Sequence, residues 1–383
     1  MDNTFSYDKP VTGKHFIGRK TDVAVLSNLI RCRENIVIYE PPKSGKMSLI
    51  QQSLFGLKKE LPFVCCELNL FNIRSTADLI RRYADAVMRS LFNTPSEYSG
   101  AVTRLLPGTH FIFDPEQYQM RGRICSLNWE WDEKDLEAAM SLPWRAAEDK
   151  STRIIVLLRE FQNVMFTEDG EQIIHLLEKF LREGSSSEPA VNFIFMGSAV
   201  NAMDEIFRQR KFFFRQVERV RLSTIDPKEI IEHIVKGFQT SGKVINSELL
   251  NGVCRLFRNN IWHINHFASV CDSLTRGYIL EPVMTEALNT MISTFTPTYC
   301  EMMDNLTGYQ VSLLKAIAEG YTKISTSEVI EKYGLNSSAN VRRLKDALCK
   351  KEIISFDDND RPYILDPLFE YWVCRCYFEI PVR

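Results

Sequence analysis

The sequence predicts an α/β fold with a parallel sheet, followed by an all-helical segment and a compact helical unit that contains a hairpin. Four short apolar runs predict the sheet, and they occupy residues 35–39, 63–68, 154–158 and 191–196. Helical patterns separate these runs, and apolar strands that alternate with helices are typical of a parallel sheet covered on both faces. From about residue 222 onward the apolar periodicity is helical until the hairpin.

Length and composition describe a globular chain. Its 383 residues, 45% of them hydrophobic and 25% charged, suffice for two or three domains with sizeable cores. The net charge of −2 excludes a broadly basic surface that coats nucleic acid, although it permits a local basic patch. The N-terminus lacks the charged and apolar regions of a secretory signal, and no apolar run reaches membrane-spanning length. We therefore expect a cytoplasmic protein that does not contact the membrane.

Cysteine and histidine residues do not form a metal-binding pattern. The ten cysteines are scattered without zinc spacing, so we expect free, buried thiols in a reducing cytoplasm. His263 and His266 have no carboxylate or cysteine neighbours at ligand spacing, so we expect them to pack in the core or at the edge of a nucleotide. The sequence predicts no metal site.

A phosphate-binding loop follows the first strand. Residues 40–50 run Glu-Pro-Pro-Lys-Ser-Gly-Lys-Met-Ser-Leu-Ile, where the motif G-x-x-x-x-G-K-[ST] is expected between a strand and a helix. In such a loop, successive backbone N–H groups and the helix N-terminus bind an anion, and the lysine reaches the outer phosphates. We predict that Lys46 contacts the phosphates of a nucleotide. The other predicted nucleotide-binding residues of the loop are Lys43, Ser44, Gly45, Met47 and Ser48.

Two positions of the loop depart from the motif. Glu40 replaces the first glycine and brings a carboxylate near the phosphates, and Met47 replaces the hydroxyl that would hold Mg²⁺. Ser48 is one residue further on, about 100° round the helix, and is not a simple replacement. Pro41 and Pro42 lack an N–H, but we expect the donors to come from the residues after them. The loop thus predicts ATP binding and argues against bound Mg²⁺.

The second acidic motif of such a site is expected at the end of the third strand. There Glu160 takes the place of a carboxylate that orients the attacking water, so it is the candidate catalytic residue. Arg159 takes the place of an aspartate that holds the magnesium shell. One interpretation is drift after loss of catalysis. The other is that the Arg159 guanidinium supplies positive charge, either by binding phosphate without metal or by neutralising Glu40, which predicts nucleotide binding that EDTA does not weaken.

A basic stretch follows the fourth strand, which ends at Gly197 and Ser198, a position suited to sensing a phosphate. Among its arginines and lysine, Arg215 is the candidate contact for a γ-phosphate in this or a neighbouring subunit. The alternative is a solvated helix face. The whole stretch comprises Arg208, Arg210, Lys211 and Arg215.

The C-terminal unit has the organisation of a winged helix-turn-helix. Three helices are expected at residues 310–318, 327–333 and 337–348, and a hairpin at residues 353–365 encloses the acidic turn 357–360. In the third helix, Arg342, Arg343 and Lys345 are candidates for contacts with the phosphates of DNA. Because the wing tip is acidic and winged helices also bind proteins, DNA and a protein partner stay as equal alternatives.

Taken together, these motifs resemble the prokaryotic AAA+/STAND-like P-loop ATPases of archaeal and Bacteroidetes type. The resemblance extends from about residue 16 to 376. It rests on the loop and on four short motifs: Phe-Ile-Gly-Arg at 16–19, Glu-Phe-Gln at 160–162, Gly-Ser at 197–198 and Asp-Pro-Leu-Phe-Glu-Tyr-Trp at 366–372.

The resemblance implies a P-loop NTPase parallel sheet, a helical lid, a C-terminal winged helix and a switch-like ATPase that uses ATP with Mg²⁺. The substitutions at Glu40, Met47 and Arg159 place magnesium binding and hydrolysis in question, but not the fold. Whether the protein is an enzyme is therefore left open.

Four regions follow from this interpretation. We expect an N-terminal tail (1–15), an ATPase core (16–222) with an insertion at 93–135 where periodicity is lost, a helical lid (223–300) and a winged helix domain (301–383). The predicted function is an ATP-binding switch with weak or lost hydrolysis, which couples nucleotide state to the winged helix and through it to an unknown protein or DNA. The alternatives are a nucleotide-independent pseudo-ATPase scaffold and a DNA-binding regulator.

Overall fold

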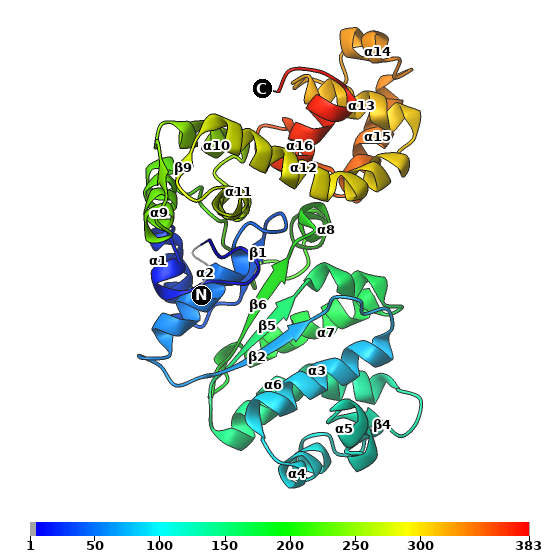
Figure 1. Ribbon diagram of the computed structural model, residues 1–383. Helices are drawn as coiled ribbons and strands as arrows, with labels where there is room; N and C mark the ends of the chain where they lie inside the picture. The colour runs from blue at the N-terminus through cyan, green and yellow to red at the C-terminus, as the bar shows by residue number, and fades with distance from the viewer. Residues whose placement is uncertain (1–4, 383) are drawn as a thin grey trace. The chain divides into compact units, whose positions relative to one another are not determined.

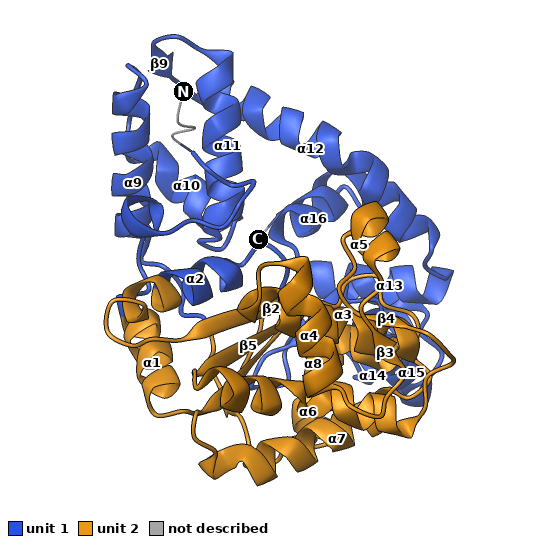
Figure 2. Ribbon diagram, turned by 90° about the horizontal axis from the view of Figure 1, so that it is seen from below, with its two compact units in different colours: residues 1–20, 41–52, 222–383 blue, residues 21–40, 53–221 orange. Residues whose placement is uncertain are grey.

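The computed structural model describes residues 5–382. The first four residues, which belong to the predicted N-terminal tail and to the segment without a secretory signal, lie outside the described part. The chain folds into two compact units (Figure 2). Unit 1 comprises residues 1–20, 41–52 and 222–383, and unit 2 comprises residues 21–40 and 53–221. The phosphate-binding loop therefore groups with the C-terminal half of the chain.

Unit 2 is built on a five-stranded sheet with the order β2-β5-β6-β1-β7. Every neighbouring pair in this sheet is parallel, as the apolar runs predict. The predicted strands are confirmed, whereas the short, exposed edge strand β7 carries no apolar signal and was not expected. The strands are β1 (Ile36–Tyr39), β2 (Val64–Asn69), β5 (Ile154–Arg159), β6 (Val191–Gly197) and β7 (Glu218–Arg219).

Three long helices cover one face of this sheet. The helices α3 (Thr76–Leu91) and α6 (Glu133–Lys150) pack against each other and against β2, β5 and β6, and α7 (Gly170–Glu183) packs against α6 (Figure 1). Ser75 caps α3 by accepting a hydrogen bond from the Asp78 N–H. The apolar faces of these helices and the strands beneath them form one continuous core.

Residues 93–135 contain regular structure that the sequence pattern did not reveal. Two helices, α4 (Pro95–Leu105) and α5 (Pro115–Arg121), alternate with the paired short strands β3 (Phe111–Ile112) and β4 (Ser126–Leu127). The strands are too short to show a period. The helix α5 buries no side chain, so it lacks an apolar stripe.

Unit 1 contains a helical bundle, as expected after residue 222. Its helices are α9 (Pro227–Thr240), α10 (Leu249–Leu256), α11 (Ile261–Leu274) and α12 (Glu281–Asp304), with one short parallel pair, β8 (Val244–Ile245) and β9 (Tyr278–Ile279). The N-terminal segment joins this bundle, because Phe5 is buried in its core and packs on Phe238. The helix α12 passes without a break through residue 300, where the sequence analysis places a domain boundary.

The winged helix follows α12 and matches its prediction. It consists of α13 (Gly308–Ala318), α14 (Ser327–Tyr333), α15 (Ser338–Lys350), the antiparallel pair β10 (Ile354–Phe356) and β11 (Pro362–Ile364), and α16 (Pro367–Trp372). Thr326 and Ser337 cap α14 and α15 through their side chains. Gly334 ends α14 with a φ of 62°, a conformation that glycine adopts without strain. Within residues 5–382, none of the helices is long and apolar enough to span a bilayer.

Candidate functional site

The phosphate-binding loop leads from β1 into the helix α2 (Lys46–Leu57). Lys46 is only 6% exposed, and its Nζ donates hydrogen bonds to the Pro41 carbonyl at 2.8 Å and to Ser44 Oγ at 3.3 Å. The lysine therefore points back along the loop rather than into solvent. Lys43 and Gly45 both have positive φ, 63° and 92°. Alternation of right- and left-handed residues turns successive N–H groups to one side, which is the geometry of an anion nest.

Arg19 braces this loop and was not assigned a role from sequence, although it belongs to the Phe-Ile-Gly-Arg motif. Its Nη1 donates to the Ser44 carbonyl at 2.7 Å, and its Nε donates to the Ser223 carbonyl at 2.9 Å. A Cβ added to Gly45 would lie 2.9 Å from the Arg19 Nη1. The glycine is thus required both by its positive φ and by the close approach of the guanidinium.

The residues that follow Lys46 do not fit a magnesium site. The Met47 thioether is not an oxygen ligand of the kind that Mg²⁺ prefers. The hydroxyl of Ser48 accepts a hydrogen bond from the Val11 N–H at 3.1 Å, so it anchors the N-terminal segment. The first part of α2 therefore lacks the hydroxyl ligand for Mg²⁺ that the motif would supply, and anion binding at this loop stays a prediction.

Lys43, in the middle of the loop, contacts aromatic side chains of the helical bundle. Its Nζ lies 3.8 Å from the centroid of the Trp262 ring on α11 and 4.6 Å from that of Phe295 on α12. Desolvation against these rings lowers the pKa of Lys43, and the negative charge of Asp366 opposes that shift. Because Asp366 is the N-cap of α16, this lysine connects the loop with the bundle and with the winged helix electrostatically.

His263 lies beside this contact. It is 3% exposed, and its Nε2 is 3.6 Å from Asp366 Oδ1, while Tyr299 donates a hydrogen bond to Asp366 Oδ2 at 3.3 Å. Burial lowers the pKa of His263 to about 4, although Asp366 acts in the opposite direction. His266 stacks on Tyr7 of the N-terminal segment with centroids 4.4 Å apart. His263 is thus buried in unit 1, and His266 is half-buried beside the N-terminal segment.

In unit 2, the carboxyl ends of β5 and β6 bring together two motifs that were predicted separately. Glu160 Oε2 accepts hydrogen bonds from Ser198 Oγ at 2.5 Å, from the Ser198 N–H at 3.3 Å and from Gln162 Nε2 at 2.8 Å. Glu160 has a φ of 53°, so the chain turns sharply as it leaves β5. The carboxylate is held in one orientation at the edge of a cavity of about 290 Å³.

Arg159 is held on the sheet by a neighbouring carboxylate. Its Nη1 lies 2.6 Å from Glu67 Oε1 on β2. The charge partner that the structure gives to Arg159 is therefore Glu67, not the Glu40 that the sequence suggested. Its hydrogen bond with Glu67 occupies one end of the guanidinium, and its role toward phosphate stays a prediction.

Arg215 is exposed, and its guanidinium lies 5.2 Å from the exposed ring of Phe214. Two other members of its basic stretch are paired: Arg208 with Asp204 at 2.8 Å and Arg210 with Glu171 at 2.5 Å.

On the winged helix, Arg342 and Arg343 are exposed on α15. Lys345, in contrast, lies 3.2 Å from Asp360 at the wing tip and 3.7 Å from the centroid of Phe356. The acidic wing thus binds one of the three candidate phosphate contacts.

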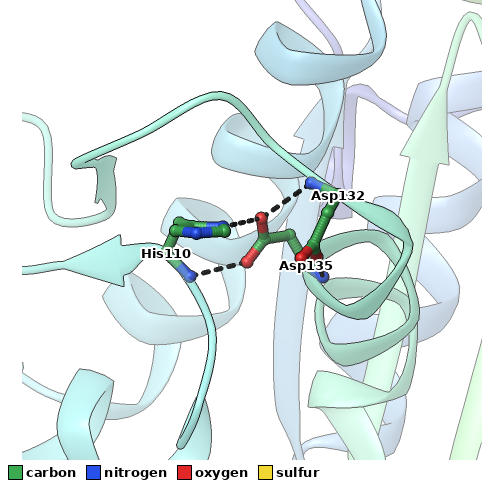
Figure 3. Close-up of side chains that lie close together, drawn as sticks. All are labelled: His110, Asp132 and Asp135. Atoms are coloured by element: carbon green, nitrogen blue, oxygen red, sulfur yellow. Dashed lines mark hydrogen bonds and ion pairs between the residues drawn. The ribbon is translucent and has the colours of Figure 1, made fainter.

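One group of side chains in unit 2 has the composition of a metal site: His110, Asp132 and Asp135 (Figure 3). Asp135 is fully buried, and it accepts hydrogen bonds from the His110 N–H at 2.7 Å, from the His110 ring at 2.8 Å and from the Asp132 N–H at 2.9 Å. Asp132 caps α6. These contacts satisfy both oxygens of Asp135 and explain the group as a structural cap that fastens β3 to α6.

Comparison with known proteins supports the fold. A family model described as a probable winged helix domain matches residues 297–375. A search of curated proteins found no match to the sequence. Among solved structures, a Walker-type ATPase of Pyrococcus abyssi is similar over 96% of this chain and 99% of that one, with a TM-score of 0.64 and 15% identity. The ORC2 protein of Aeropyrum pernix, in its ADPNP–ADP complexes, is similar over 96% of this chain and 94% of that one, with a TM-score of 0.57 and 14% identity.

At these identities the likeness concerns the fold. The chain has the α/β fold of a Walker-type ATPase over nearly its whole length and ends in a winged helix domain, which confirms the predicted fold class. The resemblance to P-loop ATPases is thereby confirmed at the level of architecture.

Proposed function

We propose that the protein is a nucleotide-controlled switch: ATP binds at the loop from Lys43 to Ser48, and its phosphates change the contact between Lys43 and the helices that carry the winged helix. The observation that carries this proposal is the position of Lys43, 3.8 Å from the Trp262 ring centroid and within the field of Asp366. A loop that binds phosphate and also contacts the bundle provides a direct route from ligand to interaction module.

Phosphate binding is supported by the residues of the loop themselves. The Lys46 ammonium is confined to the loop by Pro41 and Ser44, so it is ordered before a ligand arrives. Bound phosphate would replace these neutral acceptors with charged oxygens, and hydrogen bonds between ionised groups are about twice as strong as neutral ones. Arg19 holds the Ser44 carbonyl and so restricts rotation of the peptide that follows it.

Binding is proposed to be independent of Mg²⁺. Met47 offers no ligand and Ser48 is engaged with Val11. Metal ions normally neutralise charge that develops during phosphoryl transfer, and their loss costs several kcal/mol of transition-state stabilisation. Hydrolysis is therefore expected to be slow or absent, although Glu160 is held in a single orientation by Ser198.

The experiment is a melting and calorimetric titration of the full chain with ATP and with ADP, each in Mg²⁺ and in EDTA. ATP at about one hundred times its dissociation constant should stabilise the protein by about 2.7 kcal/mol, and EDTA should leave that value unchanged. Lys46→Ala should abolish the effect, whereas Lys58→Ala, an exposed lysine of the same charge beyond α2, should retain it. No stabilisation by either nucleotide would contradict the proposal and favour the pseudo-ATPase scaffold.

DNA is a second candidate partner of the winged helix. The exposed guanidinium groups of Arg342 and Arg343 favour it, and the pairing of Lys345 with the acidic wing opposes it. Duplex affinity that falls steeply with salt, and that Arg342→Gln weakens, would identify a DNA-binding regulator. If neither salt nor this substitution changes the affinity for duplex DNA, a protein is the better candidate for the partner of the winged helix.

A further inference from the structure

A cavity of about 600 Å³ opens in unit 2 between the start of α3 and the segment from β3 to β4. This volume lies within the range of small-ligand and side-chain binding pockets. Its lining is unusual in charge, because it contains arginines from two parts of the chain together with aspartates. The charged lining residues are Arg81, Arg121, Arg123, Asp78 and Asp114.

The two aspartates are already satisfied by their neighbours. Asp78 lies 2.5 Å from Arg81 and 2.8 Å from Arg82, so two guanidinium groups share its charge. Asp114 caps α5 and accepts hydrogen bonds from the N–H groups of Glu116 at 2.9 Å and of Gln117 at 3.2 Å. The direct contacts of both carboxylates are therefore made within their own helices.

Arg121 and Arg123, unlike Arg81, have no carboxylate at ion-pair distance among the described residues, although Asp78 and Asp85 act on Arg123 from further away. Within residues 5–382, neither makes a hydrogen bond or an ion pair through its side chain. Partial burial, and then the like charges of Arg81 and Arg121, lower the pKa of Arg123, while the charges of Asp78 and Asp85 oppose that shift. The lining thus contains three arginines and two aspartates, and this excess of positive charge suits an anion.

Two polar atoms of the lining are also buried without a partner. They are the hydroxyl of Ser126 and Oε1 of Gln117. A buried polar atom that lacks a hydrogen bond destabilises the protein, so a ligand that pairs with both atoms would remove that cost. The hydroxyl of Ser126 can donate to an anion, whereas Oε1 of Gln117 only accepts. The complementary ligand therefore carries a donor N–H or O–H as well as negative charge.

The segments that line the cavity also expose apolar side chains. Ile112 lines the cavity and is 37% exposed, and Met120 and Trp129, each next in sequence to a lining residue, are 74% and 73% exposed. Methionine and tryptophan are enriched at protein interfaces relative to the rest of the surface. Exposed apolar side chains on these segments favour a ligand that is part of a chain over a free ion.

We propose that this cavity binds a phosphorylated side chain of a partner protein. A phosphomonoester carries about −1.5 to −2 charges at neutral pH, which complements the excess of arginine over aspartate in the lining, and its oxygens suit the planar guanidinium fork. The N–H groups of a peptide supply the donor that Gln117 lacks. A continuous polyanion such as single-stranded nucleic acid fits less well, because Asp78 and Asp114 line the same wall.

The test is calorimetric titration of the full chain with short capped peptides that carry phosphoserine or phosphotyrosine, and with the same peptides without phosphate. Only the phosphorylated peptides should bind. The double substitution Arg121→Gln and Arg123→Gln should weaken binding at least tenfold. The matched control, Arg255→Gln with Arg276→Gln, removes the same charge from two exposed arginines of unit 1 and should leave binding unchanged.

Each other outcome overturns the proposal in a distinct way. Failure of every phosphopeptide to bind at millimolar concentration, or equal loss in both double variants, would show that the cavity is not a phosphate site. Inorganic phosphate that binds as tightly as the peptides would identify a small-anion site, and oligothymidylate that binds more tightly would identify a nucleic-acid site. Lys46→Ala should not change peptide binding, so this result is independent of the nucleotide switch.

Discussion

Replacement of Lys43 by methionine removes one ammonium group from the contact between the loop and the bundle while keeping a side chain of similar length. The ammonium lies 3.8 Å from the Trp262 ring centroid and 4.6 Å from that of Phe295. A cation–π contact contributes about 0.5–1 kcal/mol at an exposed site and about 2 kcal/mol when desolvated. Lys43 is intermediate, because the rings desolvate it partly while some of its side chain stays in solvent. We expect a coupling free energy between Lys43 and Trp262 of about 1 kcal/mol.

The assay is a double-mutant cycle on unfolding in urea, followed by far-UV circular dichroism so that loss of the indole does not alter the signal. The four proteins are the wild type, Lys43→Met, Trp262→Leu and the double variant. A second cycle with Lys59→Met and Phe55→Leu serves as the control, because that exposed pair lies 5.5 Å apart and should couple by less than about 0.5 kcal/mol. Equal coupling in the two cycles would refute the reasoning.

The same cycle tests the switch when it is repeated with saturating ATP. If phosphate binding draws the loop away from the bundle, the coupling between Lys43 and Trp262 should fall toward zero. If the coupling keeps its value while ATP binds, the nucleotide does not act through this contact. The control pair should be unaffected by ATP in either case.

Two further substitutions test the packing of each unit. Because burial lowers the pKa of His263 to about 4, below its unfolded value of about 6.5, the stability it confers is present above pH 6.5 and is lost as pH falls toward 4. His263→Gln should therefore reduce the difference in unfolding free energy between pH 7 and pH 4 by about 2–3 kcal/mol, despite the opposing charge of Asp366. If the unfolding free energies of the wild type and of this variant changed with pH in parallel, the argument would be wrong. Gly197→Ala would place a Cβ 2.5 Å from Met203 Sδ and should lower the free energy of unfolding by about 1–3 kcal/mol. The control Gly252→Ala, which has open space around its Cβ, should not destabilise the protein. Equal melting temperatures of the two variants would contradict the packing argument.

The architecture was predictable where local sequence determines local structure. Apolar runs identified the strands because a parallel sheet buries both faces, and β6 is buried along its whole length. Caps and turns identified the winged helix, since Thr326 and Ser337 accept the hydrogen bonds expected of N-caps and Gly334 takes the left-handed conformation. These signals act within a few residues, so a single sequence suffices to recognise them.

Contacts between distant parts of the chain were not predictable in this way. Nothing local to Arg159 indicates that it pairs with Glu67, because that contact depends on which strands become neighbours in the sheet. Likewise, residues 40–54 contain no aromatic residue that Lys43 could contact locally, and its contact with Trp262 exists only once the loop and α11 share one unit. The motif analysis predicted the order of strand, loop and helix that the structure shows, but the contact that links the loop to the bundle emerged from the fold.

The departure from the nucleotide-binding motif at Met47 takes away the hydroxyl expected to hold Mg²⁺ and leaves the rest of the loop in place. Ser48, the next hydroxyl, anchors the N-terminal segment through Val11. Restoring a hydroxyl at Met47 would therefore add one ligand while Ser48 stays engaged. The glycine, the ordered lysine and the hydrogen bond from Arg19 are all kept. If this loop binds nucleotide as we propose, it is better suited to holding a nucleotide than to hydrolysing it, which is the property that a binding-driven switch requires.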